Sequence, residues 1–204
     1  MKLTVTTFIT LDGIGQAPGG PQEDTSGGFE HGGWMMPFVD EDFGRAMSGW
    51  FEHADAFLLG RKTYEIFASY WPQVTAEDDI VATKLNSLPK YVATRTLDAA
   101  DWANTKLLKG DVAAEVAKLK TEPGRELQVH GSLNLTQTLV TAELVDEFHV
   151  LVFPLVLGGG KRLFDDIVPT GLELVESQTT SAGAMLQTYR PTGRPEYGEP
   201  PPPV

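Results

Sequence analysis

Short apolar runs with little polar alternation set the strongest limit on how this chain can fold. A run without alternation is typical of a strand that is covered on both faces, as in a parallel sheet. Such runs lie at residues 55–59, 91–94 and 147–157, and residues 126–130 form a further strand pattern. Helical patterns at residues 61–70, 78–88, 111–120 and 132–143 alternate with these strands. This order predicts an α/β domain with a mainly parallel central sheet.

Both ends of the chain add strands to this plan. Residues 2–11 are rich in β-branched side chains and predict a first strand. Residues 172–180 and 184–189 predict a closing hairpin, which gives the sheet an antiparallel C-terminal edge. We therefore expect one domain over residues 1–190. The remaining residues, 191–204, are rich in proline and predict an extended tail.

A long loop, residues 13–37, separates the first strand from a predicted helix over residues 40–53 that Asp40 can cap. A loop of this length inside a compact domain is usually functional or disordered. Its far end carries Trp34 among other apolar residues, so we expect that end to fold back over the molecule. Trp34 is a candidate substrate contact that closes over the ligand. It is nearly as well explained as an anchor of the core.

The composition disfavours several classes of function. The 204 residues carry a formal net charge of −12, whereas a general nucleic-acid binder needs a basic face. There is no cysteine, which excludes disulfides, thiolate metal sites and cysteine nucleophiles. The four histidines are far apart and form no metal motif. No apolar run approaches the roughly 18 residues of a membrane span. We expect a cytoplasmic protein that binds a small molecule, without a metal, nucleic acid or membrane.

Three turns that follow predicted strands carry glycines, hydroxyls or cations. They are Gly60-Arg61-Lys62-Thr63, Thr94-Arg95-Thr96 and Gly131-Ser132. In open α/β sheets ligands bind beyond the carboxyl ends of the strands, so all three turns lie where a ligand would bind. Free amides at a helix start and a nearby guanidinium suit a phosphate. Taken alone, each turn also fits an ordinary strand connection. Together they favour a dinucleotide with a 2′-phosphate, NADP rather than NAD.

Two further strand ends carry candidate residues. Asp12, in an Asp-Gly pair after the first strand, is a candidate proton source or a holder of a ligand amide, although such a pair is also a common turn. The segment VFPLVLGGGKRLF suggests a phosphate loop, but Leu155 and Arg162 stand where that motif needs a glycine and a Ser or Thr. We interpret its glycines as a turn that lines a ligand pocket.

Five segments, taken in order, give the chain a resemblance to a known superfamily. They are FITLDGIG, DAFLLGRKTYEIF, YVATRT, LQVHGS and VFPLVLGGGKRLF. The chain resembles the dihydrofolate-reductase-like superfamily, in the branch of stand-alone proteins similar to the C-terminal reductase domain of the bifunctional riboflavin-biosynthesis deaminase-reductase. The resemblance runs to about Tyr189 and implies a three-layer sandwich fold.

The resemblance also implies an NADPH-dependent reductase and assigns residues to each part of the cofactor. The phosphates would lie on Gly60, Arg61, Lys62, Thr63, Thr94, Arg95, Gly131, Ser132 and Leu133. The nicotinamide would lie near Leu11, Asp12, Gly13, Phe153, Pro154, Gly158 and Gly159. Family members are often homodimers, and the apolar strand over residues 148–157 is a candidate dimer contact.

Two hypotheses for the function follow. The first is an NADPH-dependent reductase that transfers a hydride to a C=N or C=O bond of a small pterin-, pyrimidine- or sugar-phosphate-like substrate. Asp12, or a water that it holds, would be the proton source. The second is a non-catalytic protein that binds NADPH or another phosphorylated ligand on the same fold. Ile14 keeps the second hypothesis open, because the riboflavin-pathway reductases carry a lysine directly after the Asp-Gly pair.

Overall fold

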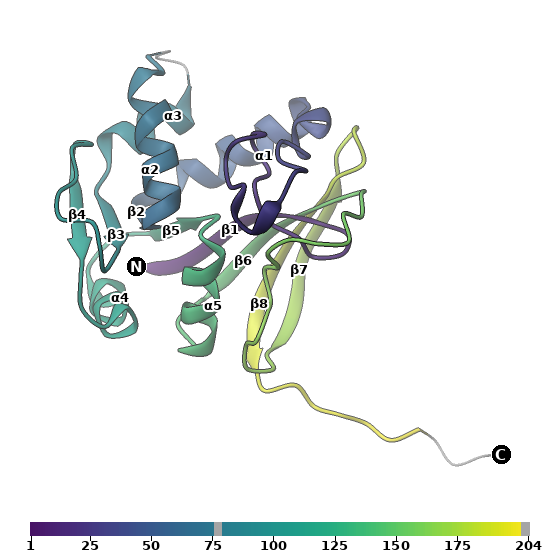
Figure 1. Cartoon of the computed structure of the whole chain (residues 1–204). Coiled ribbons are helices and arrows are strands. Elements are labelled where there is room, and N and C mark those ends of the chain that lie inside the picture. Colours follow the sequence, from purple (N-terminus) through teal and green to yellow (C-terminus); the bar gives the residue numbers. More distant parts are fainter. Residues whose placement is uncertain (76–78, 201–204) are drawn as a thin grey trace.

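An eight-stranded sheet forms the centre of the molecule (Figure 1). The computed structural model describes residues 1–75 and 79–200. The strands lie in the order β4-β3-β2-β5-β1-β6-β8-β7. Their bounds are β1 Lys2–Thr10, β2 Ala54–Gly60, β3 Lys90–Ala93, β4 Thr105–Leu108, β5 Glu126–His130, β6 Glu147–Phe153, β7 Gly171–Thr179 and β8 Met185–Gly193. Neighbours from β4 to β6 are parallel, and β8 pairs antiparallel with β6 and β7. The predicted mainly parallel sheet with an antiparallel C-terminal hairpin is confirmed.

Helices cover both faces of this sheet. In the part of the chain that the structure describes, the α-helices are α1 Glu41–Glu52, α2 Arg61–Tyr70, α3 Ile80–Ser87, α4 Val112–Thr121 and α5 Leu133–Thr141. Alternate residues of β2 show the layering, because Phe57 and Leu59 belong to the core shared with α1, α2 and α3. Leu58 instead belongs to the core shared with α4 and α5. The centre of the sheet is therefore buried on both faces, as the unbroken apolar runs predicted, whereas the edge strand β7 is largely exposed, and the fold is a three-layer sandwich.

Several predicted bounds need correction. The short strand β4 was not predicted, and β8 continues to Gly193, into the predicted tail. β6 ends at Phe153 rather than at residue 157, because a turn follows at once, with Leu155 N donating to Phe153 O at 2.8 Å. α5 ends at Thr141, two residues before the predicted end. α3 begins at Ile80, and residue 78 of the predicted helix lies outside the described residues.

The position of β6 also changes the prediction for a dimer. β6 lies inside the sheet, hydrogen-bonded to β1 on one side and to β8 on the other. Both of its backbone edges are thus occupied, and most of its side chains are buried. The apolar character of β6 reflects its place in the core, so this strand offers little surface for a dimer contact. The exposed part of the predicted segment is residues 154–157, where Val156 is 65% exposed, and a dimer stays a prediction.

Aspartate side chains cap three of the helices. The carboxylates of Asp40, Asp79 and Asp111 accept hydrogen bonds from the backbone N–H groups of Phe43, Ala82 and Ala114 at 2.8, 3.0 and 3.2 Å. Such a cap satisfies one of the amides that a helix start leaves without an intrahelical partner, and it stabilises a protein by about 1 kcal/mol. The predicted caps at Asp40 and Asp111 are confirmed, and each of these helix starts has a side-chain acceptor from the protein itself.

The first of these caps also fixes the C-terminal hairpin. The second carboxylate oxygen of Asp40 accepts from Ala182 N at 2.8 Å. Asp42 in the first turn of α1 accepts from both the N–H and the hydroxyl of Ser181, at 2.9 and 2.6 Å. The turn between β7 and β8 is therefore held on the start of α1. Among residues 1–75 and 79–200, no helix is long and apolar enough to cross a membrane.

Candidate functional site

The carboxyl ends of five parallel strands lie side by side at one edge of the sheet. Gly60 of β2 is paired with Ala93 of β3, and Thr10 of β1 is paired with Phe153 of β6. β5 lies between β2 and β1 and ends at His130. The segments after these strands are thus neighbours in the order 94–96, 60–63, 131–133, 11–13 and 154–160. We call these segments the site edge, and they contain every predicted cofactor residue except Phe153.

Ser132 joins two of the predicted turns directly. Its hydroxyl oxygen accepts from Gly60 N at 3.0 Å, and the hydroxyl donates to Thr63 Oγ1 at 2.9 Å. Gly131 and Ser132 have φ angles of 56° and 52°. Such positive values are ordinary for glycine and strained for serine. The strained backbone places the serine hydroxyl on the turn after β2, so the starts of α2 and α5 are fixed beside each other.

α2 and α5 begin at the site edge without a side-chain cap. Gly60 occupies the cap position of α2, and Ser132 occupies that of α5. Neither makes a side-chain cap hydrogen bond, because glycine has no side chain and the serine hydroxyl is engaged with the turn after β2. Ser132 is therefore not the ordinary cap that was the alternative explanation. Uncapped first-turn amides and the helix dipole together favour an anion at both helix starts.

The two cations at the start of α2 face different neighbours. Arg61 Nη1 lies 3.0 Å from Glu65 Oε1, one turn along the same helix. Lys62 Nζ lies 3.6 Å from Asp24 Oδ1, which belongs to the long loop. The structure does not bring Arg61 and Lys62 together on one ligand position. Their side chains frame the start of α2 from two sides.

The third predicted turn contributes one exposed cation. The Thr94 hydroxyl oxygen accepts from Thr96 N and Leu97 N at 3.2 and 2.9 Å, and the side chain is buried. Its hydroxyl thus fixes the shape of the turn after β3. Arg95 is exposed. Among the described residues its side chain makes no ion pair, so Arg95 is the better phosphate candidate of the two.

Asp12 ties the end of β1 to the turn after β6. Its carboxylate accepts from Thr10 Oγ1 at 2.5 Å and from the backbone N–H groups of Leu157 and Gly158 at 3.2 and 2.8 Å. The hydrogen bond from Thr10, with the two backbone donors, lowers the pKa of Asp12 to about 2. A carboxyl group with this pKa is ionised at neutral pH and holds no proton to give. The role of Asp12, or of a water that it holds, as the proton source stays a prediction.

Two other predicted contacts are core residues. Trp34 is 7% exposed, its ring packs edge-on against Phe153, and its Nε1 donates to Gln16 O at 2.7 Å. This geometry favours the alternative that Trp34 anchors the far end of the long loop. Phe153 is fully buried, so its side chain does not reach a ligand. Leu11, in contrast, is 63% exposed at the end of β1 and offers an apolar surface.

The glycines after β6 leave open space. A Cβ added at Gly158 or Gly159 would meet no atom within 4 Å. Gly158 has a φ of 78°, which explains its glycine, but Gly159 has neither a positive φ nor a close neighbour. The protein alone therefore does not require glycine at residue 159. A ligand that approaches the backbone closely there would require it.

Sequence reasoning missed the residues that fasten the long loop to the site edge. Gly15 N donates to Lys161 O, and Lys161 N donates to the Gln16 side chain, at 2.9 and 3.0 Å. Arg162 Nη1 donates to the carbonyl of Asp12. The predicted phosphate residue Leu133 also meets this loop, since a Cβ on Gly15 would lie 2.9 Å from its Cδ2. The sequence signal for these contacts is the Lys161-Arg162 pair that follows the glycines.

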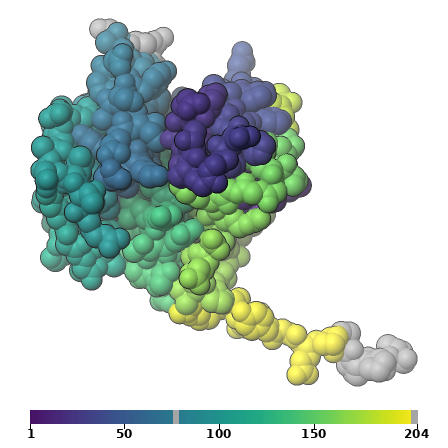
Figure 2. Space-filling model, viewed as in Figure 1, coloured from purple at the N-terminus to yellow at the C-terminus, as the bar shows by residue number. Residues whose placement is uncertain are grey.

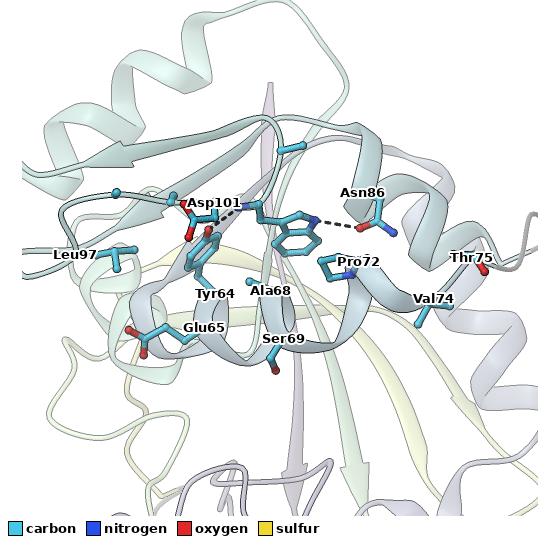
Figure 3. Close-up of a pocket in the computed structure, with 14 residues that line it drawn as sticks. Tyr64, Glu65, Ala68, Ser69, Pro72, Val74, Thr75, Asn86, Leu97 and Asp101 are labelled. Atoms are coloured by element: carbon cyan, nitrogen blue, oxygen red, sulfur yellow. Dashed lines mark hydrogen bonds between the residues drawn. The ribbon is translucent and has the colours of Figure 1, made fainter.

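Two hollows lie near the site edge, and they differ in their lining residues. A cavity of about 800 Å³ lies between α2, the segment after it and residues 97–103 (Figure 3). Its lining includes the carboxylates of Glu65 and Asp101 but no Lys or Arg, so it does not suit a phosphate. A smaller hollow of about 430 Å³ lies between residues 26–31 of the long loop and residues 159–161. In Figure 2 the loop, in dark purple, lies against the blue surface of α2 and the green surface that follows β6.

Comparisons of the sequence identify relatives along nearly the whole chain. A family model described as the RibD C-terminal domain matches residues 1–186. The uncharacterized protein YyaP of Bacillus subtilis (strain 168) is 30% identical over 197 residues, which cover 94% of this chain and 96% of that protein.

Solved structures share the fold. A putative riboflavin biosynthesis protein from Shewanella sp. PV-4 matches with a TM-score of 0.71 and 22% identity, covering 94% of this chain and 99% of that one. Dihydrofolate reductase from Enterococcus faecalis, complexed with NADP(H) and RAB-propyl, matches with a TM-score of 0.59 and 14% identity, covering 94% and 96%. The predicted dihydrofolate-reductase-like fold is confirmed, and the chain belongs to the RibD C-terminal domain family.

Proposed function

We propose that this protein is an NADPH-dependent reductase that acts on a C=N or C=O bond of a small pterin-, pyrimidine- or sugar-phosphate-like substrate. The observation that carries the proposal is the pair of uncapped helix starts, α2 and α5, held beside each other by Ser132. The family match and the fold shared with dihydrofolate reductase support it.

The residues at the site edge fit a dinucleotide. The amides at the starts of α2 and α5 and the hydroxyl of Thr63 would hold the pyrophosphate. Arg61 and Arg95, which follow the neighbouring strands β2 and β3, would hold the 2′-phosphate. Leu11, Gly13, the backbone at Pro154 and the open space at Gly159 would border the nicotinamide. When bound, the cofactor supplies the hydride.

The chain itself contributes orientation and dryness. Asp12 fixes the turn after β6 against β1, so the two segments that border the nicotinamide keep their spacing. The long loop is hydrogen-bonded along this turn and would keep water from one side of the nicotinamide. The exposed side chain of Leu11 adds an apolar wall.

Titration of the protein with NADPH, followed by cofactor fluorescence, tests the first half of the proposal. Binding in the micromolar range is expected, with weaker binding of NADH because it lacks the 2′-phosphate. Absorbance assays of NADPH oxidation with pterin, pyrimidine and sugar-phosphate carbonyl or imine substrates test the second half. Absence of NADPH binding at millimolar cofactor would end the proposal.

A second candidate function is a non-catalytic NADPH or phosphorylated-ligand binding protein. One observation favours keeping it: Ile14 is fully buried where the riboflavin-pathway reductases carry a lysine. This candidate predicts NADPH binding without oxidation by any of the substrates above. Turnover of NADPH with one of them would exclude it.

A further inference from the structure

Asp24 of the long loop forms ion pairs with two lysines, Lys161 in the segment after β6 and Lys62 at the start of α2. Its Oδ2 lies 2.5 Å from Lys161 Nζ, after β6, and its Oδ1 lies 3.6 Å from Lys62 Nζ, at the start of α2. Lys161 Nζ also donates to Ser26 Oγ at 2.7 Å. One carboxylate therefore ties the loop both to α2 and to the segment after β6, which agrees with the place of the loop in Figure 2.

The two ties differ in strength. On the Lys161 side, the ion pair is short and the Gln16 side chain donates to the carbonyls of Asp24 and Ser26, both at 2.9 Å. On the other side, the Lys62 ion pair is long and the lysine side chain is 58% exposed, which makes it a weak surface pair. The loop is thus firmly part of the β6 side, and Lys62 is its only ion pair with α2 among the described residues.

Lys62 has a second use in the same place. It stands in the first turn of α2, whose uncapped amides favour an anion. A pyrophosphate bound there carries more charge than one carboxylate and would form a stronger ion pair with the lysine. A phosphate over the helix start would compete with Asp24 for this ammonium group, because its contact with Asp24 is long and exposed.

We propose that Lys62 is a shared cation: Asp24 holds it in the ligand-free protein, and the pyrophosphate of a bound ligand takes it, which releases the long loop from α2 and leaves it bound to Lys161. The proposal rests on the proposed function, since it takes the cofactor's pyrophosphate as the ligand group. Binding the cofactor then frees the long loop on the side that faces α2. By linkage, any change that weakens the hold of Asp24 on Lys62 tightens the ligand by the same factor.

A double-mutant cycle tests this exchange with inorganic pyrophosphate as the probe. Asp24→Asn is expected to tighten pyrophosphate about two- to fivefold at low salt, the size of an exposed ion pair. In a Lys62→Ala background, Asp24→Asn is expected to have no effect. Glu65→Gln is the matched control, because it makes the same change of charge beside Arg61 on the same helix without touching the loop. Equal tightening with and without Lys62 would overturn the proposal, as would no pyrophosphate binding by the wild type.

Hydrogen exchange of the loop gives a readout that does not depend on the cofactor or on activity. Pyrophosphate is expected to speed amide exchange in residues 19–31 of the wild type, and Lys62→Ala is expected to do so without ligand. Glu65→Gln is expected to leave exchange unchanged. Slower or unchanged exchange on adding pyrophosphate would overturn the proposal. If pyrophosphate gives the expected result and NADPH does not bind, the shared cation stands and the proposed reductase function fails.

Discussion

The helices of this molecule begin in two different ways. α1, α3 and α4 start on aspartates whose carboxylates accept backbone amides. α2 and α5 start on Gly60 and Ser132 and have no side-chain cap. The capped starts belong to the scaffold, where a cap contributes about 1 kcal/mol. The uncapped starts forgo that stabilisation at the site edge.

This difference shows how a stable fold keeps a place for a ligand. A carboxylate at the cap position would stabilise α2 or α5 but would occupy the amides that a phosphate needs. Ser132 has the side chain for a cap, yet its strained backbone turns the hydroxyl to Gly60 and Thr63 instead. Ser132 thus fixes the two helix starts beside each other and leaves their first-turn amides without a side-chain cap.

The largest expected effect comes from giving α5 a negative cap. Ser132→Asp places a carboxylate beside both uncapped helix starts, and aspartate tolerates the positive φ of this position. NADPH binding is expected to weaken about ten- to a hundredfold, the effect of losing a charge-assisted hydrogen bond. Fluorescence titration measures it. Ser132→Asn, with the same shape and no charge, should stay within a few-fold of the wild type, and an equal loss in both variants would assign the effect to shape.

The next effect separates the two cations of α2. The resemblance assigned both to the cofactor phosphates. The structure separates them, because Arg61 pairs with Glu65 on its own helix and Lys62 faces Asp24 of the long loop. Arg61→Ala is expected to weaken NADPH about tenfold and NADH little. Lys62→Ala is expected to change both equally. A loss of NADPH selectivity in Lys62→Ala instead would reverse the two assignments.

As the pH falls, the stabilisation that depends on His130, next to the site edge, should be lost before the stabilisation that depends on the Asp40 cap. Burial, with the nearby His149, lowers the pKa of His130 to about 3, and His130 directly precedes Gly131. Since the unfolded pKa is about 6.5, its stabilisation is complete above pH 6.5 and falls by about 1.4 kcal/mol per pH unit below it. Urea unfolding at pH 7 and pH 5.5 measures this loss, which His130→Phe should reduce. An unchanged pH dependence in that variant would exclude His130.

The contribution of the Asp40 cap to the free energy of unfolding should change only at lower pH. The amide of Phe43, with that of Ala182, holds the pKa of Asp40 below its ordinary value of 3.8. The folded state therefore favours the ionised carboxylate, and the stabilisation from this group is lost as the pH falls through and below 3.8. Unfolding of Asp40→Asn between pH 5 and pH 3 should show a smaller pH dependence than the wild type. Equal slopes would mean that the cap does not depend on the charge.

The smallest effect is expected at the cap of α4, which follows β4 beside the end of β3. Asp111→Ala removes the cap of α4 and should lower the free energy of unfolding by about 1 kcal/mol. It should leave NADPH affinity unchanged, because the Asp111 carboxylate serves the first turn of α4 and is not one of the predicted cofactor residues. Urea unfolding and a fluorescence titration on the same preparation check both parts. A change in NADPH affinity would show that loss of the Asp111 cap alters the cofactor site as well as the stability of the protein.

The sequence predicted the site edge because strand ends follow from local patterns. Unbroken apolar runs identified the parallel strands, and the turns after them contained Gly60, Arg95 and Ser132. It did not predict contacts that only the folded loop creates. The pairing of Asp24 with Lys62 and Lys161 joins residues far apart in the chain. Trp34 and Phe153 were assigned to ligands because an apolar residue in a loop or at a strand end gives no local sign of whether it is buried.

Backbone amide NMR of the protein titrated with NADPH tests the central claim most directly. The account predicts the largest chemical-shift changes at the first-turn amides of α2, residues 61–63, and of α5, residues 133–135. The capped amides of Phe43, Ala82 and Ala114 should change little. Saturable binding with its largest changes elsewhere, or no change at either uncapped helix start, would contradict the account.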